Sequence, residues 1–538
     1  MTVQDNVVQE SQTDLYDLVV IGGGINGVGI ARDAAGRGLK VLLVEKGDFA
    51  GATSSASSKL IHGGLRYLEY YEFRLVREAL AERERLLAIA PHIAWPMNFV
   101  MPHVASLRPR WMIRTGLFLY DRLGGRISLA KSKSVVLTNS ILGQPLKEMF
   151  SRGFTYSDAW VDDARLVLLN ALSAQKHGAV LLPRVSFEQA KRVGDEWQIE
   201  IKPTDAHPYL EQVSCQIRSK MLVNASGPWV GQVQARIQSK IESDDVSKKK
   251  AVEDKGQIRL VQGSHMVVPR CYEGDHAYIL QHTDRRVIFM LPYERDYTLI
   301  GTTDLPLDDP NQLPKMTDAE VDYLCDAVNH YLEKPLTPQD VIWRYSGVRP
   351  LMDDGDVENA SAVSRDYELK IDAVDGKAPL LTVMGGKLTT YRKLSEHALD
   401  DLAKFCINLP QGWTDKEPLS GGDIPQGWNG FSAWQAEFIK QYPHLDPEFL
   451  ASITRRYGTV TPTVLGDAQT MSDLGQYFGG GLYEAEVHYL RHTEWAWQAE
   501  DVLWRRTKCG LHMSEAERAH FIEWFQSLPK PEAPSQTS

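Results

Sequence analysis

Residues 16–27 read Tyr-Asp-Leu-Val-Val-Ile-Gly-Gly-Gly-Ile-Asn-Gly, an apolar run that leads into a glycine-rich turn. The apolar run at 16–21 is typical of a buried strand, and the small residues at 26–38 predict a helix directly after the turn. A second strand is predicted at 40–45. This strand–helix–strand order indicates a parallel sheet that begins close to the N-terminus.

Each part of the turn has a physical role in holding a dinucleotide. Gly22 allows the tight turn, Gly24 lets the backbone approach a pyrophosphate, and Gly27 allows close helix–strand packing. The helix N-terminus offers free N–H groups and a positive dipole end to the phosphates. Glu45 can accept hydrogen bonds from a ribose and would repel the 2′-phosphate of NADP. The turn therefore predicts FAD or NAD, and a glycine-rich turn without a ligand is the alternative.

Two later segments favour FAD over NAD. Residues 53–59 read Thr-Ser-Ser-Ala-Ser-Ser-Lys and precede His62-Gly63-Gly64. Small hydroxyl donors and backbone N–H groups suit a diphosphate and a flavin ring laid across the chain, although a plain polar loop has the same composition. The segment 384–390, Met-Gly-Gly-Lys-Leu-Thr-Thr, suits a second backbone approach to a flavin. If so, a distant piece of chain closes the cofactor domain.

Bulk composition limits the remaining choices. The chain has 538 residues, too many for one ordinary core, and a formal charge of −11, which argues against a nucleic-acid partner. Its five cysteines are scattered without a CxxC pair, so neither a zinc nor an iron–sulfur site is predicted. The polar residues 1–15 do not resemble a secretory signal, and no apolar run approaches the length needed to cross a bilayer. We therefore expect a cytoplasmic or peripheral protein.

The middle of the chain differs in composition from its start. Residues 65–90 predict a long charged helix that Pro91 stops. The region from roughly 185 to 345 is richer in strand-like segments, and 242–256 has the composition of a charged surface loop. The strand-like segments include 264–269, 287–291 and 298–301.

Five motifs carry a resemblance to a known family. They are Ile-Gly-Gly-Gly-Ile-Asn-Gly at 21–27, Ala-Thr-Ser-Ser-Ala-Ser-Ser-Lys-Leu-Ile-His-Gly-Gly-Leu-Arg-Tyr at 52–67, Tyr-Ser-Gly-Val-Arg-Pro-Leu at 345–351, Gly-Gly-Lys-Leu-Thr-Thr-Tyr-Arg at 385–392 and Leu-Trp-Arg-Arg-Thr-Lys at 503–508. Together these segments resemble the aerobic, FAD-dependent glycerol-3-phosphate dehydrogenase family over about residues 16 to 520. The second motif is long enough to be highly specific.

The resemblance implies a fold and a division of the chain. The fold class is α/β plus α: a Rossmann-like FAD-binding domain interleaved with an antiparallel-sheet substrate domain, as in amino-acid oxidases, and a helical C-terminal cap domain. Frequent proline and glycine predict a linker before the cap. The predicted parts are a disordered tail at 1–15, the interleaved FAD-binding and substrate domains at 16–407 (substrate part roughly 95–150 and 255–345), the linker at 408–430, the helical domain at 431–526 and a disordered tail at 527–538.

The resemblance also implies an activity and partners. The family oxidises sn-glycerol 3-phosphate to dihydroxyacetone phosphate by hydride transfer to FAD, and it passes the electrons to ubiquinone. Its members act at the inner face of the cytoplasmic membrane and are commonly dimers. We therefore expect a homodimer that associates peripherally with this membrane from the cytoplasm and has no nucleic-acid partner.

The predicted cofactor contacts lie along the first part of the chain and in two later segments. FAD is the cofactor that the motifs imply. The residues predicted to bind it are Gly22, Gly24, Asn26, Gly27, Glu45, Lys46, Thr53, Ser54, Ser57, Ser58, Lys59, His62, Gly63, Gly64, Ala225, Gly227, Gly386, Lys387, Leu388 and Thr389.

A phosphorylated polyol needs cationic donors, and the planar fork of arginine pairs well with phosphate oxygens. Hydride transfer from C2 also needs a base for the hydroxyl proton, which favours histidine. His62 and His265 are the candidates, and each is explained equally well as a packed, hydrogen-bonded histidine. Arg349 and Lys387 complete the predicted catalytic set because they would stabilise a developing alkoxide. By similarity to the family, the substrate site contains Arg66, Tyr67, His265, Arg349, Arg365 and Lys387.

Several alternatives stay open on the sequence. The segment 108–122 mixes arginines with Trp, Met, Ile, Leu, Phe and Tyr, and a buried helix with arginine caps is favoured over a helix in a lipid interface. The same substrate site would serve a glycerol-3-phosphate oxidase that uses oxygen, and a flavin oxidase of the amino-acid type is a second rival. The acidic composition argues against a non-catalytic, RNA-associated flavoprotein.

Overall fold

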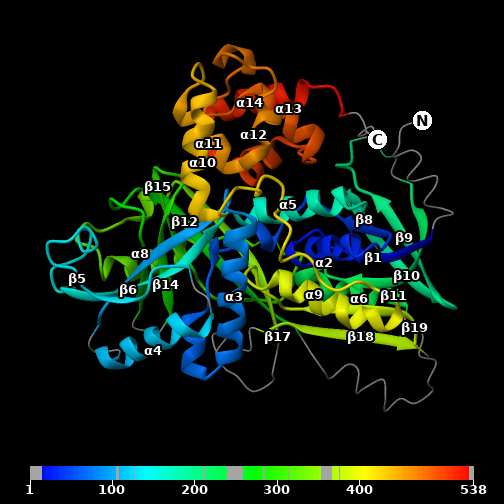
Figure 1. Cartoon of the computed structure of the whole chain (residues 1–538), viewed down its shortest axis with the longest axis horizontal. Helices are drawn as coiled ribbons and strands as arrows, with labels where there is room; N and C mark the ends of the chain where they lie inside the picture. Colours follow the sequence, from blue (N-terminus) through cyan, green and yellow to red (C-terminus); the bar gives the residue numbers. More distant parts are fainter. Residues whose placement is uncertain are drawn as a thin grey trace.

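The computed structural model describes residues 15–531, with several short gaps. The charged segment at 242–256 and most of the two predicted tails therefore lie outside the described residues. Figure 1 shows one β-sheet at the right of the view, a second at the left, and the C-terminal helices above both. The exceptions are 105–107, 126–127, 209, 211–212, 239–257, 283, 285, 313, 353–365, 375 and 407, and the side chains of Arg66 and Met352.

The first sheet is built around parallel strands. β1 (Leu15–Ile21) pairs in parallel with β2 (Val41–Glu45) and with β10 (Cys215–Asn224), and β10 pairs in parallel with β19 (Lys377–Met384). Both faces of β1 are covered, which explains why its sequence is apolar at nearly every position. The sheet also contains β7 (Val180–Pro183), β8 (Val185–Val193), β9 (Glu196–Pro203), β11 (Ile237–Gln238) and β18 (Glu368–Val374).

The second sheet is mostly antiparallel, and the strand-rich middle of the sequence supplies much of it. Its long strand β12 (Ile258–Pro269) pairs with β15 (Tyr297–Gly301), β16 (Leu305–Leu307) and β17 (Trp343–Met352). The sheet also contains β3 (Leu60–Ile61), β4 (Ala94–Pro102), β5 (Lys133–Val136), β6 (Arg152–Val161), β13 (Ala277–Gln281) and β14 (Val287–Tyr293). The chain crosses between the two sheets several times, because β3 to β6 and β12 to β17 belong to the second sheet and the strands before, between and after them belong to the first.

Three helices pack together against the first sheet: α2 (Ile25–Gly36), α5 (Asp163–Lys176) and α9 (Tyr391–Leu402). Small residues let them approach closely, since a Cβ on Gly29 of α2 would lie 2.6 Å from Ser395 Oγ of α9. The small-residue composition that predicted the first helix is therefore a packing requirement.

The helix predicted at 65–90 is divided into two pieces. A short 3-10 helix, η2 (Leu65–Tyr70), is followed by Tyr71 with a φ of 60°, and α3 (Phe73–Ile89) then runs to the residues before Pro91. The left-handed backbone at Tyr71 ends the first piece because a regular helix does not continue through that conformation.

The helix α4 (Arg110–Leu123) lies on the surface beside η2 and α3. Only Leu117 and Tyr120 of its residues are buried, whereas Trp111 is 69% exposed. The buried helix that the composition of 108–122 favoured is therefore wrong. In Figure 1 this helix lies at the bottom of the view, far from the C-terminal helices.

The C-terminal helices enclose a core of their own, which includes Leu450, Leu482 and Leu490. The helices are α10 (Trp428–Gln441), α11 (Pro447–Tyr457), α12 (Thr461–Leu465), α13 (Glu484–Thr493) and α14 (Glu515–Ser527). The predicted helical C-terminal domain is present, and the two sheets confirm the predicted fold class. Across the described ranges, no helix combines the length and the apolar character that a membrane span requires.

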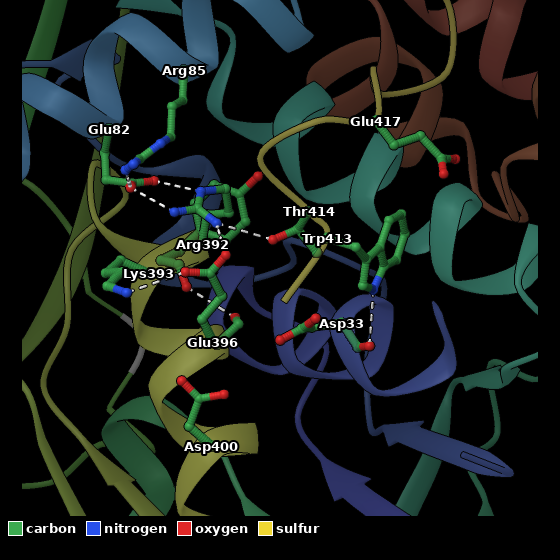
Figure 2. Close-up of polar contacts among 12 residues, drawn as sticks. Asp33, Glu82, Arg85, Arg392, Lys393, Glu396, Asp400, Trp413, Thr414 and Glu417 are labelled. Atoms are coloured by element: carbon green, nitrogen blue, oxygen red, sulfur yellow. Dashed lines mark hydrogen bonds and ion pairs between the residues drawn. The ribbon is translucent and has the colours of Figure 1, made fainter. Parts of the chain in front are cut away.

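The chain between α9 and α10 is held tightly against the first sheet's helices, as Figure 2 shows. Trp413 lies against Gly36, where a Cβ would come within 2.0 Å of the indole, and its Nε1 donates to the carbonyl of Asp33 (3.2 Å). Arg392 of α9 donates to Thr414 Oγ1 (3.1 Å) and makes two bonds of 2.7 Å to Glu82 of α3. This connection is therefore held in place at Trp413 and Thr414.

Candidate functional site

The carboxyl ends of the parallel strands β1, β2, β10 and β19 meet at one edge of the first sheet. The turn after each strand contributes predicted cofactor residues: 22–27, 45–51, 225–229 and 385–390. In open α/β sheets, ligands bind at this edge. The sheet topology therefore brings together residues that lie more than 300 positions apart in the sequence.

The glycine turn requires glycine for steric reasons. Gly22 has a φ of 114°, and a Cβ on it would lie 2.6 Å from the carbonyl oxygen of Ala225. A Cβ on Gly27 would lie 1.9 Å from the carbonyl oxygen of Gly22. At the N-terminus of α2 the N–H of Ile25 donates to Ser54 Oγ (3.0 Å), so a hydroxyl oxygen sits at a helix end that suits a phosphate oxygen.

The turn after β2 is bonded to the glycine turn at both of its ends. Glu45 accepts hydrogen bonds from the N–H groups of Gly23 (2.6 Å) and Gly47 (2.7 Å), and the N–H of Ala50 donates to the carbonyl of Gly23 (3.2 Å). The Lys46 ammonium lies 3.7 Å from the centre of the Trp229 ring, next to Gly227. Glu45 retains oxygen lone pairs for a ribose hydroxyl.

The hydroxyl run at 53–59 connects the two sheets. Thr53 Oγ1 donates to the carbonyl of Val348 on β17 (2.7 Å). Ser57 donates through its hydroxyl (2.8 Å) and its N–H (3.1 Å) to Asp163, and the Lys59 ammonium pairs with the same carboxylate at 2.7 Å. Because Lys59 and Asp163 are both buried, this pair fixes the loop and neutralises the charge of Lys59.

His265 lies in the second sheet at the point where this loop reaches it. Its Nε2 is 2.8 Å from Ser58 Oγ, and its ring stacks on Tyr345 with a centroid distance of 4.9 Å. Among the described residues its Nδ1 has no hydrogen-bond partner. Burial, together with the positive charges of Lys59 and Arg349, lowers the pKa of His265 to about 3. The imidazole is therefore neutral at physiological pH.

Arg349 projects from β17 toward β12 and the chain after β15. Its Nη2 donates to the carbonyl of Thr303 (2.9 Å) and to the carboxylate of Asp304. Gly263 provides the space, because a Cβ there would lie 2.8 Å from Arg349 Nη2. The guanidinium is thus held in one place while part of it remains exposed.

The late glycine segment returns to the start of α2. Asn26 Nδ2 donates to the carbonyl of Gly385 (3.2 Å), and a Cβ on Gly386 would lie 2.8 Å from the same Nδ2. The Lys387 ammonium lies 4.1 Å from the centre of the Tyr67 ring. Leu388 follows at the same turn, and Thr389 is buried.

The remaining predicted residues are partly described. His62 is half-buried directly after β3, and Gly63 donates its N–H to Tyr120 Oη (2.8 Å). Gly64 has a φ of 72°, and a Cβ on it would collide with the Tyr67 ring. The side chain of Arg66 and the whole of Arg365 lie outside the described residues.

The described residues fit an FAD molecule. The N-cap residue of α2 is Gly24, which has no side chain to cap the helix, and in the described chain Asn26 Oδ1 is buried without a hydrogen-bond partner. Gly22, Gly24 and Gly27 keep the backbone free of side chains at that end. Helix N-terminal N–H groups suit a pyrophosphate, and the Glu45 carboxylate and the Asn26 amide oxygen can accept hydrogen bonds from hydroxyl groups such as those of a ribose.

Comparison with known proteins agrees with this geometry. The fold and the site define an FAD-dependent oxidoreductase, and the family model described as FAD dependent oxidoreductase matches residues 17–392. A model described as the C-terminal domain of alpha-glycerophosphate oxidase matches residues 413–522. A glycerol-3-phosphate dehydrogenase of Pseudomonas aeruginosa is 49% identical over 96% of each chain, and the aerobic enzyme of Escherichia coli is 47% identical over 95% of this chain and 97% of its own. The chain belongs to the family of FAD-dependent glycerol-3-phosphate dehydrogenases, and FAD is its cofactor.

Two further relatives bear on substrate and fold. A D-erythritol 1-phosphate dehydrogenase of Brucella abortus is 47% identical over 96% of this chain and 99% of its own. The structure of a Bacillus halodurans glycerol-3-phosphate dehydrogenase complexed with FAD has the same fold, with a TM-score of 0.71 at 24% identity over 99% of both chains. The shared fold therefore extends over 99% of the chain, whereas relatives of similar identity carry different substrate names.

Sequence reasoning missed several residues that support the site. Asp163, which holds Ser57 and Lys59, looks in the sequence like one of two acids at the start of a helix. Tyr345, which stacks on His265 and donates to the carbonyl of Ser57 (2.8 Å), stood inside a quoted motif without a role. Asp304 is an isolated acid in the sequence. No local pattern could have identified any of these contacts, because each depends on how distant strands pair.

Proposed function

We propose that this protein oxidises sn-glycerol 3-phosphate to dihydroxyacetone phosphate. FAD, when bound, supplies the acceptor for the hydride that leaves C2 of the substrate. The observation that carries the proposal is the meeting of the cofactor loop with a partly exposed arginine and a buried histidine. Thr53 contacts Val348 beside Arg349, and Ser58 contacts His265.

Arg349 and Lys387 are the proposed phosphate ligands. Arg349 is held by Thr303 and Asp304, and its side chain is 30% exposed. A phosphate dianion would compete with Asp304 for this cation and would accept charge-assisted, bidentate hydrogen bonds from it. Lys387 adds a point charge from the opposite sheet, where its ammonium lies over Tyr67.

His265 is the proposed base for the hydroxyl proton. Its Nε2 contact with Ser58 and its stacking on Tyr345 fix the ring, and in the described part of the chain its Nδ1 has no partner. The pKa of about 3 results first from burial of the ring and then from the positive charges of Lys59 and Arg349. A bound phosphate dianion offsets these charges and raises the pKa of His265, so the substrate itself would make the histidine a better base. His62 is the alternative base.

D-Erythritol 1-phosphate is the second candidate substrate, because a relative named for it is 47% identical to this chain. Both molecules are polyol phosphates, and the same cations would hold either phosphate. One experiment with two parallel titrations distinguishes the two candidate substrates. The purified protein is titrated anaerobically with each compound, and loss of the flavin absorption band is followed; we expect glycerol 3-phosphate to bleach the band at the lower concentration. If neither compound bleaches the band, the proposed activity is wrong.

The electron acceptor is proposed to be ubiquinone at the inner face of the cytoplasmic membrane. Support comes from an exposed apolar surface around α4, here named the α4 patch, next to Arg110 and Arg122. Exposed aromatic side chains with flanking arginines suit an interface with anionic lipid. The patch consists of Tyr71, Phe73, Trp111, Met112, Phe118 and Leu119.

A direct test uses vesicles that contain anionic lipid and a soluble quinone analogue. Phe118→Ser should reduce vesicle binding without changing the rate with the soluble analogue. Ile141→Ser is the matched control, because Ile141 is 55% exposed and does not belong to the patch. Equal vesicle binding of both variants and the unmodified protein would refute the α4 patch as the contact.

Oxygen is the rival acceptor, because the C-terminal family model is named for an alpha-glycerophosphate oxidase. Hydrogen peroxide formed in step with substrate loss would establish the oxidase, whereas rapid reoxidation by a quinone analogue without peroxide supports the dehydrogenase.

The division of the chain and its assembly are also proposed. We place the interleaved FAD-binding and substrate domains at 16–407, the linker at 408–430, and the helical domain at 431–526. The segment 408–427 has no long helix or strand, which supports the linker. A homodimer is expected, and sedimentation of the FAD-loaded protein tests it.

A further inference from the structure

The motif at 503–508 has no part in the proposed chemistry, yet it contacts the cofactor-binding sheet. It overlaps the short helix η8 (Asp501–Arg506), which follows α13 in the C-terminal domain. Arg506 pairs with Asp48 through two bonds, Nη1 to Oδ2 at 2.6 Å and Nη2 to Oδ1 at 2.8 Å. Arg505 adds a third bond from its Nε to Asp48 Oδ2 at 2.5 Å. The C-terminal domain therefore places two arginines on one aspartate of the other domain.

Asp48 stands in the middle of the turn that follows β2. The residues on either side of it are bonded to the glycine turn, since Gly23 donates to Glu45 and accepts from Ala50. Phe49 is buried, and a Cβ on Gly23 would lie 2.8 Å from its ring. A shift of Asp48 would therefore move the ribose-binding carboxylate and the pyrophosphate-binding backbone together.

A second contact supports the same turn from the side. Asp501 of η8 pairs with Arg184 Nη2 at 2.6 Å, and the backbone N–H of Arg184 donates to the carbonyl of Gly47 at 2.9 Å. Phe49 also makes an edge contact with Trp495, at 5.1 Å between ring centroids. The C-terminal domain thus contacts Asp48 and Phe49 directly, and it holds Gly47 through Arg184.

The ion pair is sealed from solvent. Arg506 and Asp48 have side chains that are 0% and 3% exposed. Burial alone would raise the pKa of Asp48, but the charges of Arg506 and Arg505 outweigh it and hold the pKa at about 2. Asp48 is therefore ionised in the folded protein, and removal of an arginine would leave a buried carboxylate with too few partners.

We propose that the C-terminal domain holds the FAD-binding turn in its binding conformation, with Arg505 and Arg506 as positioning residues that act through Asp48. FAD binding then depends on a domain that supplies none of the residues predicted to touch the cofactor. A preorganised turn binds more tightly because the ordering cost is met before the ligand arrives.

The test compares FAD affinity in full-length variants, measured by flavin fluorescence after the cofactor has been removed and then added back. Arg506→Met keeps the length of the side chain and removes its charge, and we expect the Kd for FAD to rise at least tenfold. Arg456→Met is the matched control. It breaks a pair with Glu486, with N–O distances of 2.9 and 3.1 Å, inside the C-terminal domain and away from the turn. Its Kd for FAD should stay within twofold of the unmodified protein.

The pair Asp48→Asn and Asp48→Asn/Arg506→Met closes a double-mutant cycle. The Kd for FAD of the double variant should not exceed the higher of the two single-variant values, because both changes remove the same contact. If Arg506→Met does not fold, Arg505→Gln replaces it, since Arg505 is 19% exposed and one of two arginines on Asp48. The proposal is overturned if the arginine variant melts at a lower temperature but binds FAD like the control, or if the losses in the cycle add.

Discussion

Arg349 and Arg506 each face an aspartate, but the two ion pairs are built differently. The side chains of Arg349 and Asp304 are 30% and 18% exposed, and the contact uses Nη2 of the guanidinium. The Arg506–Asp48 pair is sealed, and two nitrogens meet both carboxylate oxygens. A partly open pair can exchange its aspartate for an incoming phosphate, whereas a sealed bidentate pair has to stay intact.

This contrast extends to the rest of the molecule. The charges proposed to meet substrate, Arg349 and Lys387, are partly exposed. Around the first sheet and the C-terminal domain, buried pairs such as Arg392–Glu82 hold separate elements together. Breaking an open pair should therefore change catalysis, and breaking a sealed pair should change stability or cofactor retention.

The largest effect is expected at the open pair. Arg349→Ala and Lys387→Ala should each lower kcat/KM about 10³-fold, roughly 4 kcal/mol of transition-state binding, because the phosphate loses a charged partner. The flavin absorption band should be retained in both variants. Steady-state kinetics with glycerol 3-phosphate provide the measurement, and unchanged kinetics in both variants would remove the phosphate-site assignment.

A sealed pair should show the opposite pattern. Glu82→Gln removes the carboxylate that makes two hydrogen bonds to the buried Arg392 and leaves Glu396 as its charged partner. We expect a loss of about 3 kcal/mol in the free energy of unfolding with little change in kcat. Urea denaturation of the FAD-loaded protein measures the loss. Glu437→Gln is the matched control, since its pair with Lys440 is exposed and should contribute less than about 1 kcal/mol. Equal effects of the two substitutions would contradict the contrast.

The pH dependence of stability gives a further test of how buried groups behave, and His92 is a suitable residue for it. Burial and the charges of Arg165 and Arg455 lower the pKa of His92 from 6.5 to about 3. In the unfolded chain His92 takes up a proton below pH 6.5, so its contribution to stability is complete above that pH and is lost as the pH falls toward 3. For one such group, the free energy of unfolding falls by up to about 1.4 kcal/mol for each pH unit in this range. His92→Gln should flatten the decline of the melting temperature between pH 6.5 and 4, and parallel curves for the two proteins would count against this pKa.

The smallest effect is expected at Asp304. Asp304→Asn keeps a hydrogen-bond acceptor for Arg349 but removes the competing charge. KM for glycerol 3-phosphate should therefore fall by less than about tenfold while kcat stays the same, since a weak, partly solvated pair contributes about 1 kcal/mol. A rise in KM instead would mean that Asp304 positions Arg349 and does not compete with the substrate.

Much of the fold could be predicted because its signals are local. The glycine turn, the two flanking strands and Glu45 specify the first unit of the sheet from fewer than 35 residues. The helix predicted at 65–90 was interrupted because the left-handed conformation at Tyr71 has no marker in its sequence. The exposure of α4 could not be predicted from the sequence either, since its apolar residues would suit a buried core equally well.

The site was predicted less completely, and for a physical reason. Residue types that bind phosphate or accept a proton can be recognised in motifs, as for Arg349, Lys387 and His265. The residues that orient them, such as Asp163 for Lys59, are recognised only when distant strands have paired. The roles assigned to the site residues stay predictions until the kinetic tests are made.

The position of β19 in the first sheet has a consequence for synthesis. This strand pairs with β10 and leads into Gly385, which contacts Asn26 near the start of the chain. A nascent chain that still lacks residues 377–390 has made the glycine turn but not the far wall of the cofactor site. Capture of FAD on the ribosome would thus be delayed until roughly the last quarter of translation, and early fragments would need protection of the C-terminal end of β10, residues 222–224, which pairs with β19.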